Sequence, residues 1–306
     1  MLTIFRNASG RFTSMRYMDD TVVMKRLTKR ITFNKVWKTL FFLATMFALV
    51  TLAILLYRIV SQGIGYLNID FLTNFASRFA DKAGIKAALI GSLWLMAVVA
   101  PVSIILGVGT AIYLEEYAKK NRINDFIRMN ISNLAGVPSI VFGLLGLTIF
   151  VRMMGLGKSI LAAGFTMSLL ILPVIIVAAQ EAIRAVPNEQ REASYGMGAT
   201  KWQTILRVVL PAAIPGILTG SILAMSRAIG ETAPLVVIGI PVILQFLPNS
   251  LLSQFTALPM QIYDWAKRPQ EAFQYVAAAG ILVLMTVLLL MNSIAIFIRN
   301  KFQKRY

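Results

Sequence analysis

Two charged residues inside an apolar stretch are the first candidates for chemistry in this sequence. Arg227 and Glu231 stand four residues apart, so they would lie on one face of a helix. A charge within a membrane costs roughly 2.5–3.5 kcal/mol on insertion scales, so both groups must face protein or water. They form either an ion pair that only neutralises both groups or the lining of a substrate path in which Arg227 meets an anion. Gly230 and Pro234 are expected to weaken the helix beside them.

The chain lacks the residue types on which many catalytic and metal sites depend. It has no Cys and no His, which excludes disulfides, thiolate or imidazole metal sites, and Ser-His or Cys-His nucleophilic catalysis. The stretch GLGKS at 155–159 resembles the end of a phosphate-binding loop, but Arg152 stands where that pattern requires Gly. We therefore expect no enzyme activity, no metal, no cofactor and no nucleotide-binding site in this chain.

Apolar segments long enough to cross a membrane recur along the chain. Its 306 residues are 58% hydrophobic and 14% charged, which is too apolar for a soluble domain of this length. Since about 20 apolar residues cross a hydrocarbon core of about 30 Å, the sequence predicts an all-α membrane protein. Six transmembrane helices are expected, at 39–60, 87–114, 132–151, 159–179, 212–234 and 276–298. Segment 235–247 is too short to cross, and is either re-entrant or a continuation of the fifth helix.

The distribution of positive charge indicates how these helices are oriented. Twenty-one of the 30 Lys and Arg residues fall in segments 1–38, 115–130, 180–211 and 299–306, against eight on the opposite side. The positive-inside rule then predicts that both termini are cytoplasmic, with 61–86 an external loop. The net charge of +17 reflects topology and contact with anionic membrane lipid rather than nucleic acid. Because a 38-residue basic tail precedes the first span, we expect an anchor rather than a cleaved signal peptide.

The cytoplasmic segment 180–211 is expected to form a surface element that docks into another protein. Pro187 suits the first position of a short helix, which Gly196 and Gly198 would end. Thr200–Gln203 is a capping-box pattern that begins a second helix, and Pro211 would end or kink it. The segment has too few large apolar residues to form a core.

A stripe of small residues repeats every four positions along the fifth expected span. In lipid such stripes allow helices to pack backbone to backbone. We expect a helix-packing role for Gly216, Gly220, Ala224 and Ala228.

The cytoplasmic segment also carries a known signature. Glu-Ala-Ser at 192–194, three residues, Gly198, nine residues and Val-x-Leu-Pro at 208–211 resemble the EAA signature of ABC importer permeases, with Ser194 and Val208 as mild departures. In that family the loop docks into a groove of the ATPase subunit. The resemblance implies this coupling role for Glu192, Ala193, Ser194, Gly198, Ala199, Thr200, Leu210 and Pro211.

Longer stretches are similar to the phosphate-specific branch of that family. They read LAGVPSIVFGLLG, QEAIRAVPNEQREASYGMGATKWQTILRVVLPAAIPGILTG and RAIGETAPL, and the similarity extends from about 85 to 298. It implies a type I importer permease fold in the bacterial inner membrane, phosphate as substrate, and functional roles for Arg227 and Glu231. The implied partners are a second permease subunit, an ATPase dimer and an external phosphate-binding protein.

Other functions remain possible from the residues alone. The loop signature does not separate phosphate from another oxyanion, such as phosphonate, molybdate or sulfate. A secondary transporter or channel would show paired inverted repeats, and the sequence shows none. An intramembrane enzyme would need a nucleophile or metal constellation, whereas the only buried ionisable pair we expect is Arg227 with Glu231.

Overall fold

We describe the protein from a computed structural model, which covers residues 5–6, 12–13, 20–119 and 121–302. Parts of the expected tails, 1–38 and 299–306, lie outside these ranges. The chain forms two compact units, Met1–Arg58 and Ile59–Tyr306.

The first unit consists of two short strands and most of a long helix. Strands β1 (Phe5–Arg6) and β2 (Phe12–Thr13) pair antiparallel. Helix α1 (Asp20–Gly63) begins within the expected basic tail and continues through the first expected span. Threonine hydroxyls within it, such as that of Thr45, donate to the carbonyl four residues earlier.

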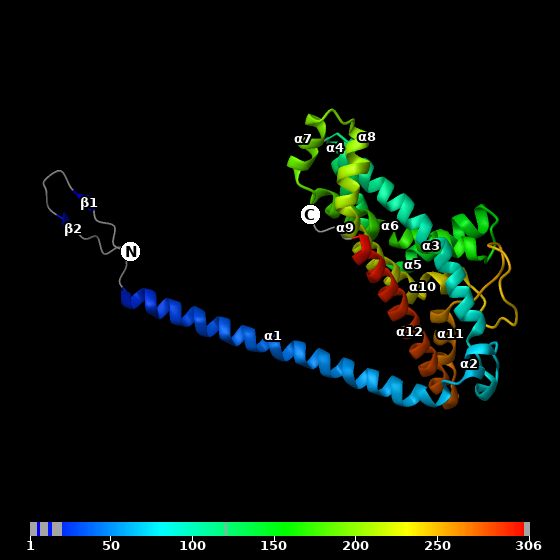
Figure 1. Ribbon diagram of the computed structural model, residues 1–306. Coiled ribbons are helices and arrows are strands. Elements are labelled where there is room, and N and C mark those ends of the chain that lie inside the picture. The colour runs from blue at the N-terminus through cyan, green and yellow to red at the C-terminus, as the bar shows by residue number, and fades with distance from the viewer. Residues whose placement is uncertain (1–4, 7–11, 14–19, 120, 303–306) are drawn as a thin grey trace. The chain divides into compact units, whose positions relative to one another are not determined.

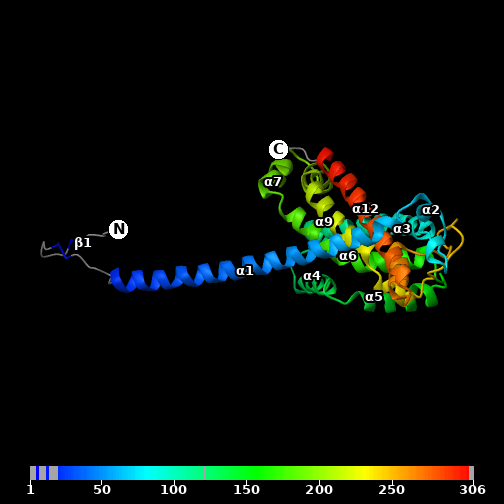
Figure 2. The ribbon, with the colours of Figure 1, turned by 90° about the horizontal axis from the view of Figure 1, so that it is seen from below.

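The second unit is helical (Figure 1). Its α-helices are α2 (Ile69–Thr73), α3 (Lys86–Ile112), α4 (Arg122–Leu134), α5 (Ser139–Gly146), α6 (Ile160–Arg184), α7 (Asn188–Gly196), α8 (Lys201–Thr204), α9 (Leu210–Gly230), α10 (Ala233–Ile238), α11 (Leu258–Lys267) and α12 (Glu271–Phe302). Short 3₁₀ segments η1 (Ile64–Tyr66) and η2 (Ala80–Lys82) and π segments η3 (Tyr113–Tyr117), η4 (Leu147–Met153) and η5 (Ile205–Val209) complete it. Helices α7 and α2 lie at opposite ends of this unit (Figures 1 and 2).

The all-α membrane fold predicted from the sequence is confirmed. Among the described residues, five helical stretches are long and apolar enough to cross a membrane: Leu27–Tyr66, Lys86–Tyr117, Ile160–Arg184, Lys201–Gly230 and Glu271–Lys301. A sixth crossing is present if the bent pair Arg122–Leu134 and Ser139–Met153 counts as one.

The third expected span, 132–151, is not one continuous helix. Helices α4 and α5 meet at an angle of 102°, and the bend lies at Ala135–Pro138. Proline disfavours helical geometry at the residue before it, here Val137, and Pro138 precedes α5 in a non-helical conformation. The apolar run therefore divides between the end of α4 and the α5–η4 segment.

The fifth expected span, 212–234, ends four residues early. Helix α9 stops at Gly230, and Glu231 has the extended angles φ −76° and ψ 122°. The following apolar residues form the short helix α10, which packs so closely on α5 that a Cβ at Gly143 would lie 2.8 Å from Pro234 Cα. Segment 235–247 is thus not among the membrane-length helices, and the break at Glu231 and Thr232 separates it from α9.

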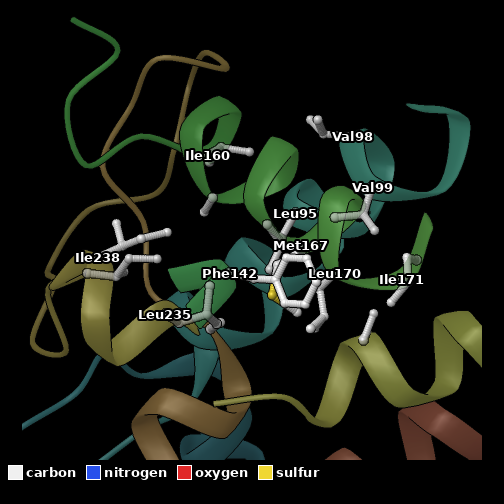
Figure 3. Packing of buried hydrophobic residues seen from close by; sticks show 14 of the residues in the cluster. Leu95, Val98, Val99, Phe142, Ile160, Met167, Leu170, Ile171, Leu235 and Ile238 are labelled. Atoms are coloured by element: carbon white, nitrogen blue, oxygen red, sulfur yellow. The ribbon is translucent and has the colours of Figure 1, made fainter. Parts of the chain in front are cut away.

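Helix α6 occupies the centre of the second unit, between α3 and α9. Its side chains Ile160, Met167 and Ile171 are almost fully buried. Figure 3 shows Met167 and Leu170 meeting side chains from α3 and α5. Because lipid tails are as apolar as these side chains, close packing rather than water exclusion holds the helices together.

Candidate functional site

The segment between α6 and α9 forms a helix, a tight turn and a second helix. Pro187 immediately precedes α7, rather than being its first helical residue, and α7 ends at Gly196. Gly198 has a φ of +83°, a left-handed conformation that favours glycine. Thr200 then begins α8 with the predicted capping box, in which Gln203 N–H donates to Thr200 Oγ1 and Thr200 N–H donates to Gln203 Oε1.

Two buried hydroxyl groups fasten α7 to α8. Ser194 Oγ and Thr204 Oγ1 lie 2.9 Å apart, and Ala199 N–H donates to the Ser194 carbonyl at 3.2 Å. Ser194 is one of the two departures from the family signature, and the structure gives its hydroxyl a partner. The two short helices are therefore held in one geometry by side-chain as well as backbone contacts.

One surface of this element is exposed and partly apolar. Met197 is 83% exposed, and Tyr195 and Trp202 are also exposed. Glu192 and Ala193 lie on the exposed surface of α7. A contiguous exposed apolar patch with polar residues at its rim marks a contact with a protein or a membrane.

The sequence predicted that Pro211 would end or kink the second helix of the segment, and the helix does not end there. It continues from Lys201 to Gly230 as one stretch. Proline lacks an N–H and its ring clashes with the carbonyl four residues earlier. The π segment η5 precedes Leu210 and Pro211, and Leu210 N–H donates to the Ile205 carbonyl five residues back. This wider turn accommodates the proline, so the surface element continues directly into a membrane-length helix.

A group of ionised side chains lies beside this element, and no expectation from the sequence included it. Glu115 accepts hydrogen bonds from Gln180 at 2.9 Å and from Arg184 at 2.8 and 2.9 Å, and also from Arg128. A cavity of about 610 Å³ adjoins it and is lined by residues that include Glu116 and Arg191. The available signal was two consecutive acidic residues at the end of an apolar span.

Arg227 and Glu231 are brought together as their spacing suggested. Arg227 Nε lies 3.3 Å from Glu231 Oε1, in the last turn of α9 and at the residue that follows it. Their side chains are 49% and 21% exposed in this chain alone. The pair lies at the C-terminal end of α9, with Glu231 just outside the helix, rather than inside a continuous helix.

The four small residues of α9 lie at close contacts or in the core. A Cβ at Gly216 would lie 2.7 Å from Ala182 Cβ, and one at Gly220 would lie 2.2 Å from Ala178 Cβ. Ala224 and Ala228 are almost fully buried. Helices α9 and α6 therefore approach each other at a distance that a larger side chain would not permit.

No group of three or more carboxylate side chains that could hold a metal ion occurs in the described part of the chain. Three candidate regions are therefore present: the Arg227–Glu231 pair at the end of α9, the exposed α7–α8 element, and the ionic cluster beside that element.

The sequence of this chain is similar to those of known membrane transport proteins. Residues 101–304 match the family described as binding-protein-dependent transport system inner membrane component. The chain is 34% identical to the phosphate transport system permease protein PstA 1 of Mycobacterium tuberculosis (strain CDC 1551 / Oshkosh), over 94% of this chain and 96% of the relative. It is 32% identical to PstA of Haemophilus influenzae, over 90% and 96%. It is 38% identical to the probable ABC transporter permease protein YqgI of Bacillus subtilis, over 58% and 60%.

Solved structures show the same fold. The inward-facing MetNI methionine ABC transporter has a TM-score of 0.59 at 16% identity, over 72% of this chain and 96% of that chain. A bacterial alginate ABC transporter in complex with an alginate-bound periplasmic protein has a TM-score of 0.60 at 15% identity, over 88% and 96%.

Proposed function

Because this chain belongs to the family of binding-protein-dependent transport system inner membrane components, we propose that it is a membrane-spanning subunit of an ATP-driven importer of inorganic phosphate. It is a multi-pass protein of the cytoplasmic membrane. As a permease subunit it is not itself an enzyme, and ATP is hydrolysed by a separate subunit. The observation that carries phosphate as substrate is the 34% identity to a phosphate permease over 94% of the chain.

We propose that the exposed α7–α8 element is where the ATPase subunit docks. Its residues Glu192, Ala193, Gly198 and Thr200 are exposed, while Ser194 and Thr204 hold the two helices together from within. The element leads without interruption into α9. A docked subunit that moves the element would therefore move a membrane-length helix as well.

Arg227 and Glu231 are proposed to line the phosphate path. A half-exposed guanidinium on a membrane helix is tolerated only where it faces protein or water. The face of α9 that carries Arg227 is thus covered by a second permease subunit or faces an aqueous path. The ion pair with Glu231 would moderate the attraction of Arg227 for the anion, because a site that binds an ion too tightly cannot release it.

A double replacement separates this role from simple charge neutralisation. The Arg227→Gln, Glu231→Met variant removes both charges and so leaves no uncompensated group. It is expected to assemble and hydrolyse ATP but to move no phosphate. Uptake at nearly the wild-type rate would return both residues to a structural role.

The partners are a second permease subunit, an ATPase and an external substrate-binding protein. In the phosphate branch these are proposed to be PstC-like, PstB-like (as a dimer) and PstS-like proteins. Copurification of the chain from detergent-solubilised membranes tests this assembly. We expect all three to appear with the chain, and recovery without any ATPase would count against an ATP-driven importer.

A further inference from the structure

The ionic cluster at the end of α3 connects the exposed α7–α8 element to the membrane helices. Glu115 and Glu116 are consecutive residues of the π segment η3, and their side chains are only 10% and 8% exposed. Exposed ion pairs contribute little, because both partners remain solvated and mobile. These two carboxylates are withdrawn from water, so their geometry is held by the arginines around them.

Glu115 joins three helices at one carboxylate. Arg184 of α6 donates from Nε to Oε2 and from Nη2 to Oε1, a bidentate pair with a fixed orientation. Gln180 of α6 and Arg128 of α4 donate to Oε1 as well. The end of α3 is thereby fixed against the end of α6 and the middle of α4.

Glu116 connects the same segment to α7. Arg191 of α7 donates to Glu116 Oε1 at 3.2 Å, and to the carbonyl oxygens of Ile183 and Val186 at 2.8 Å each. The last carbonyls of a helix have no partner within that helix, and Arg191 supplies one at the end of α6. One guanidinium therefore holds α7 to α6 and to η3 at once.

These contacts come from distant parts of the sequence and meet where a force on α7 would reach α3 and α6. Helices α3 and α6 pack against each other and share a buried cluster around Ala111, Ala179 and Ile183. A stiff joint between α7 and both of them would transmit a displacement, whereas a flexible joint would absorb it.

We propose that Glu116 and Arg191 are positioning residues for ATP-driven transport, because they hold α7 in place against α3 and α6. The inference rests on the proposed function, in which α7 receives the ATPase subunit. Arg191 is only 16% exposed, so it acts by fixing α7 rather than by contacting the ATPase itself.

Two conservative variants test this role in the assembled complex. Glu116→Gln keeps the size of the side chain and removes its charge. Arg191→Lys keeps the charge, but a single ammonium group lacks the planar fork that reaches two carbonyls and a carboxylate together. Asp264→Asn is the matched control, because Asp264 on α11 forms a partly buried ion pair with Arg268, the residue that follows this helix.

The first readout is the distance between η3 and the end of α7, which does not depend on the substrate. The chain has no cysteine, so spin labels can be placed at the exposed positions Tyr113 and Met197, with the other subunits made cysteine-free. We expect one narrow distance distribution in the parent and the control, and a broadened one in Glu116→Gln and Arg191→Lys.

The second readout is the number of phosphate ions moved per ATP hydrolysed. We expect it to fall at least about tenfold in both variants, since the loss of a hydrogen bond to a charged group changes an equilibrium by at least about that factor. An unchanged distance distribution would overturn the inference. So would a broadened distribution with a wild-type ratio, or an equal effect of Asp264→Asn. Failure of the parent complex to move phosphate would instead reject the proposed substrate, and the distance readout would still decide whether Glu116 and Arg191 hold α7 in place.

Discussion

Two neighbouring glycines in the turn between α7 and α8 are expected to respond oppositely to the same substitution. Gly198 has a φ of +83°, whereas Gly196 is the last residue of α7. A Cβ at either position would meet no atom within 4 Å. Since space is available at both, backbone conformation alone decides the effect of alanine.

The magnitudes follow from these two conformations. The left-handed region costs a residue with a Cβ about 1–2 kcal/mol, so Gly198→Ala should destabilise the turn by that amount. Glycine in the middle of a helix is less favourable than alanine by about 0.5–1 kcal/mol, so Gly196→Ala at the end of α7 should stabilise that helix by up to this amount. Converted to equilibrium constants, the turn should open about 5–30 times more often in the first variant and up to about 2–5 times less often in the second.

Hydrogen exchange measures this opening directly. The amides to follow are those of Ala199, bonded to the Ser194 carbonyl, and Thr204, bonded to the Thr200 carbonyl. Exchange at both should accelerate in Gly198→Ala and slow in Gly196→Ala. Equal shifts in the same direction, or no change in Gly198→Ala, would refute the reasoning from backbone conformation.

Three further predictions concern packing, the turn and orientation. Gly220→Ala should destabilise the chain by about 1–3 kcal/mol, because its Cβ would overlap an alanine of α6. Thermal unfolding should show no such loss for Gly109→Ala, which has open space around it. Ser194→Ala should cost about 1–3 kcal/mol by leaving the buried Thr204 hydroxyl without its partner. Adding Thr204→Val should recover most of that loss, and a purely additive double variant would contradict the pairing. A reporter fused after Tyr306 should report the cytoplasm, and an external signal would reject the predicted orientation.

Features set by neighbouring residues could be predicted from the sequence. The capping box at Thr200–Gln203 and the helix end at Gly196 depend on residues within one or two turns, and both are present. The pairing of Arg227 with Glu231 also follows from a spacing of four, even though the helix ends between them.

Features set by distant or compensating contacts could not be predicted. Glu115 and Arg184 are 69 residues apart, and no local pattern joins them. Hydropathy located an apolar run at 132–151 but contains no information about the 102° bend within it. Pro211 indicated a helix end or a kink, and the π segment η5 that accommodates it has no simple sequence signal.

The most direct test of the account is phosphate accumulation in sealed proteoliposomes that contain the assembled importer. The vesicles are loaded with ATP and given an external binding protein and radiolabelled phosphate, so that the permease faces its partners on both sides. We expect accumulation that depends on ATP and is not reduced by excess sulfate, molybdate or phosphonate. ATP hydrolysis without accumulation of phosphate, or accumulation of another of these oxyanions in its place, would contradict the assignment of this chain as a phosphate permease.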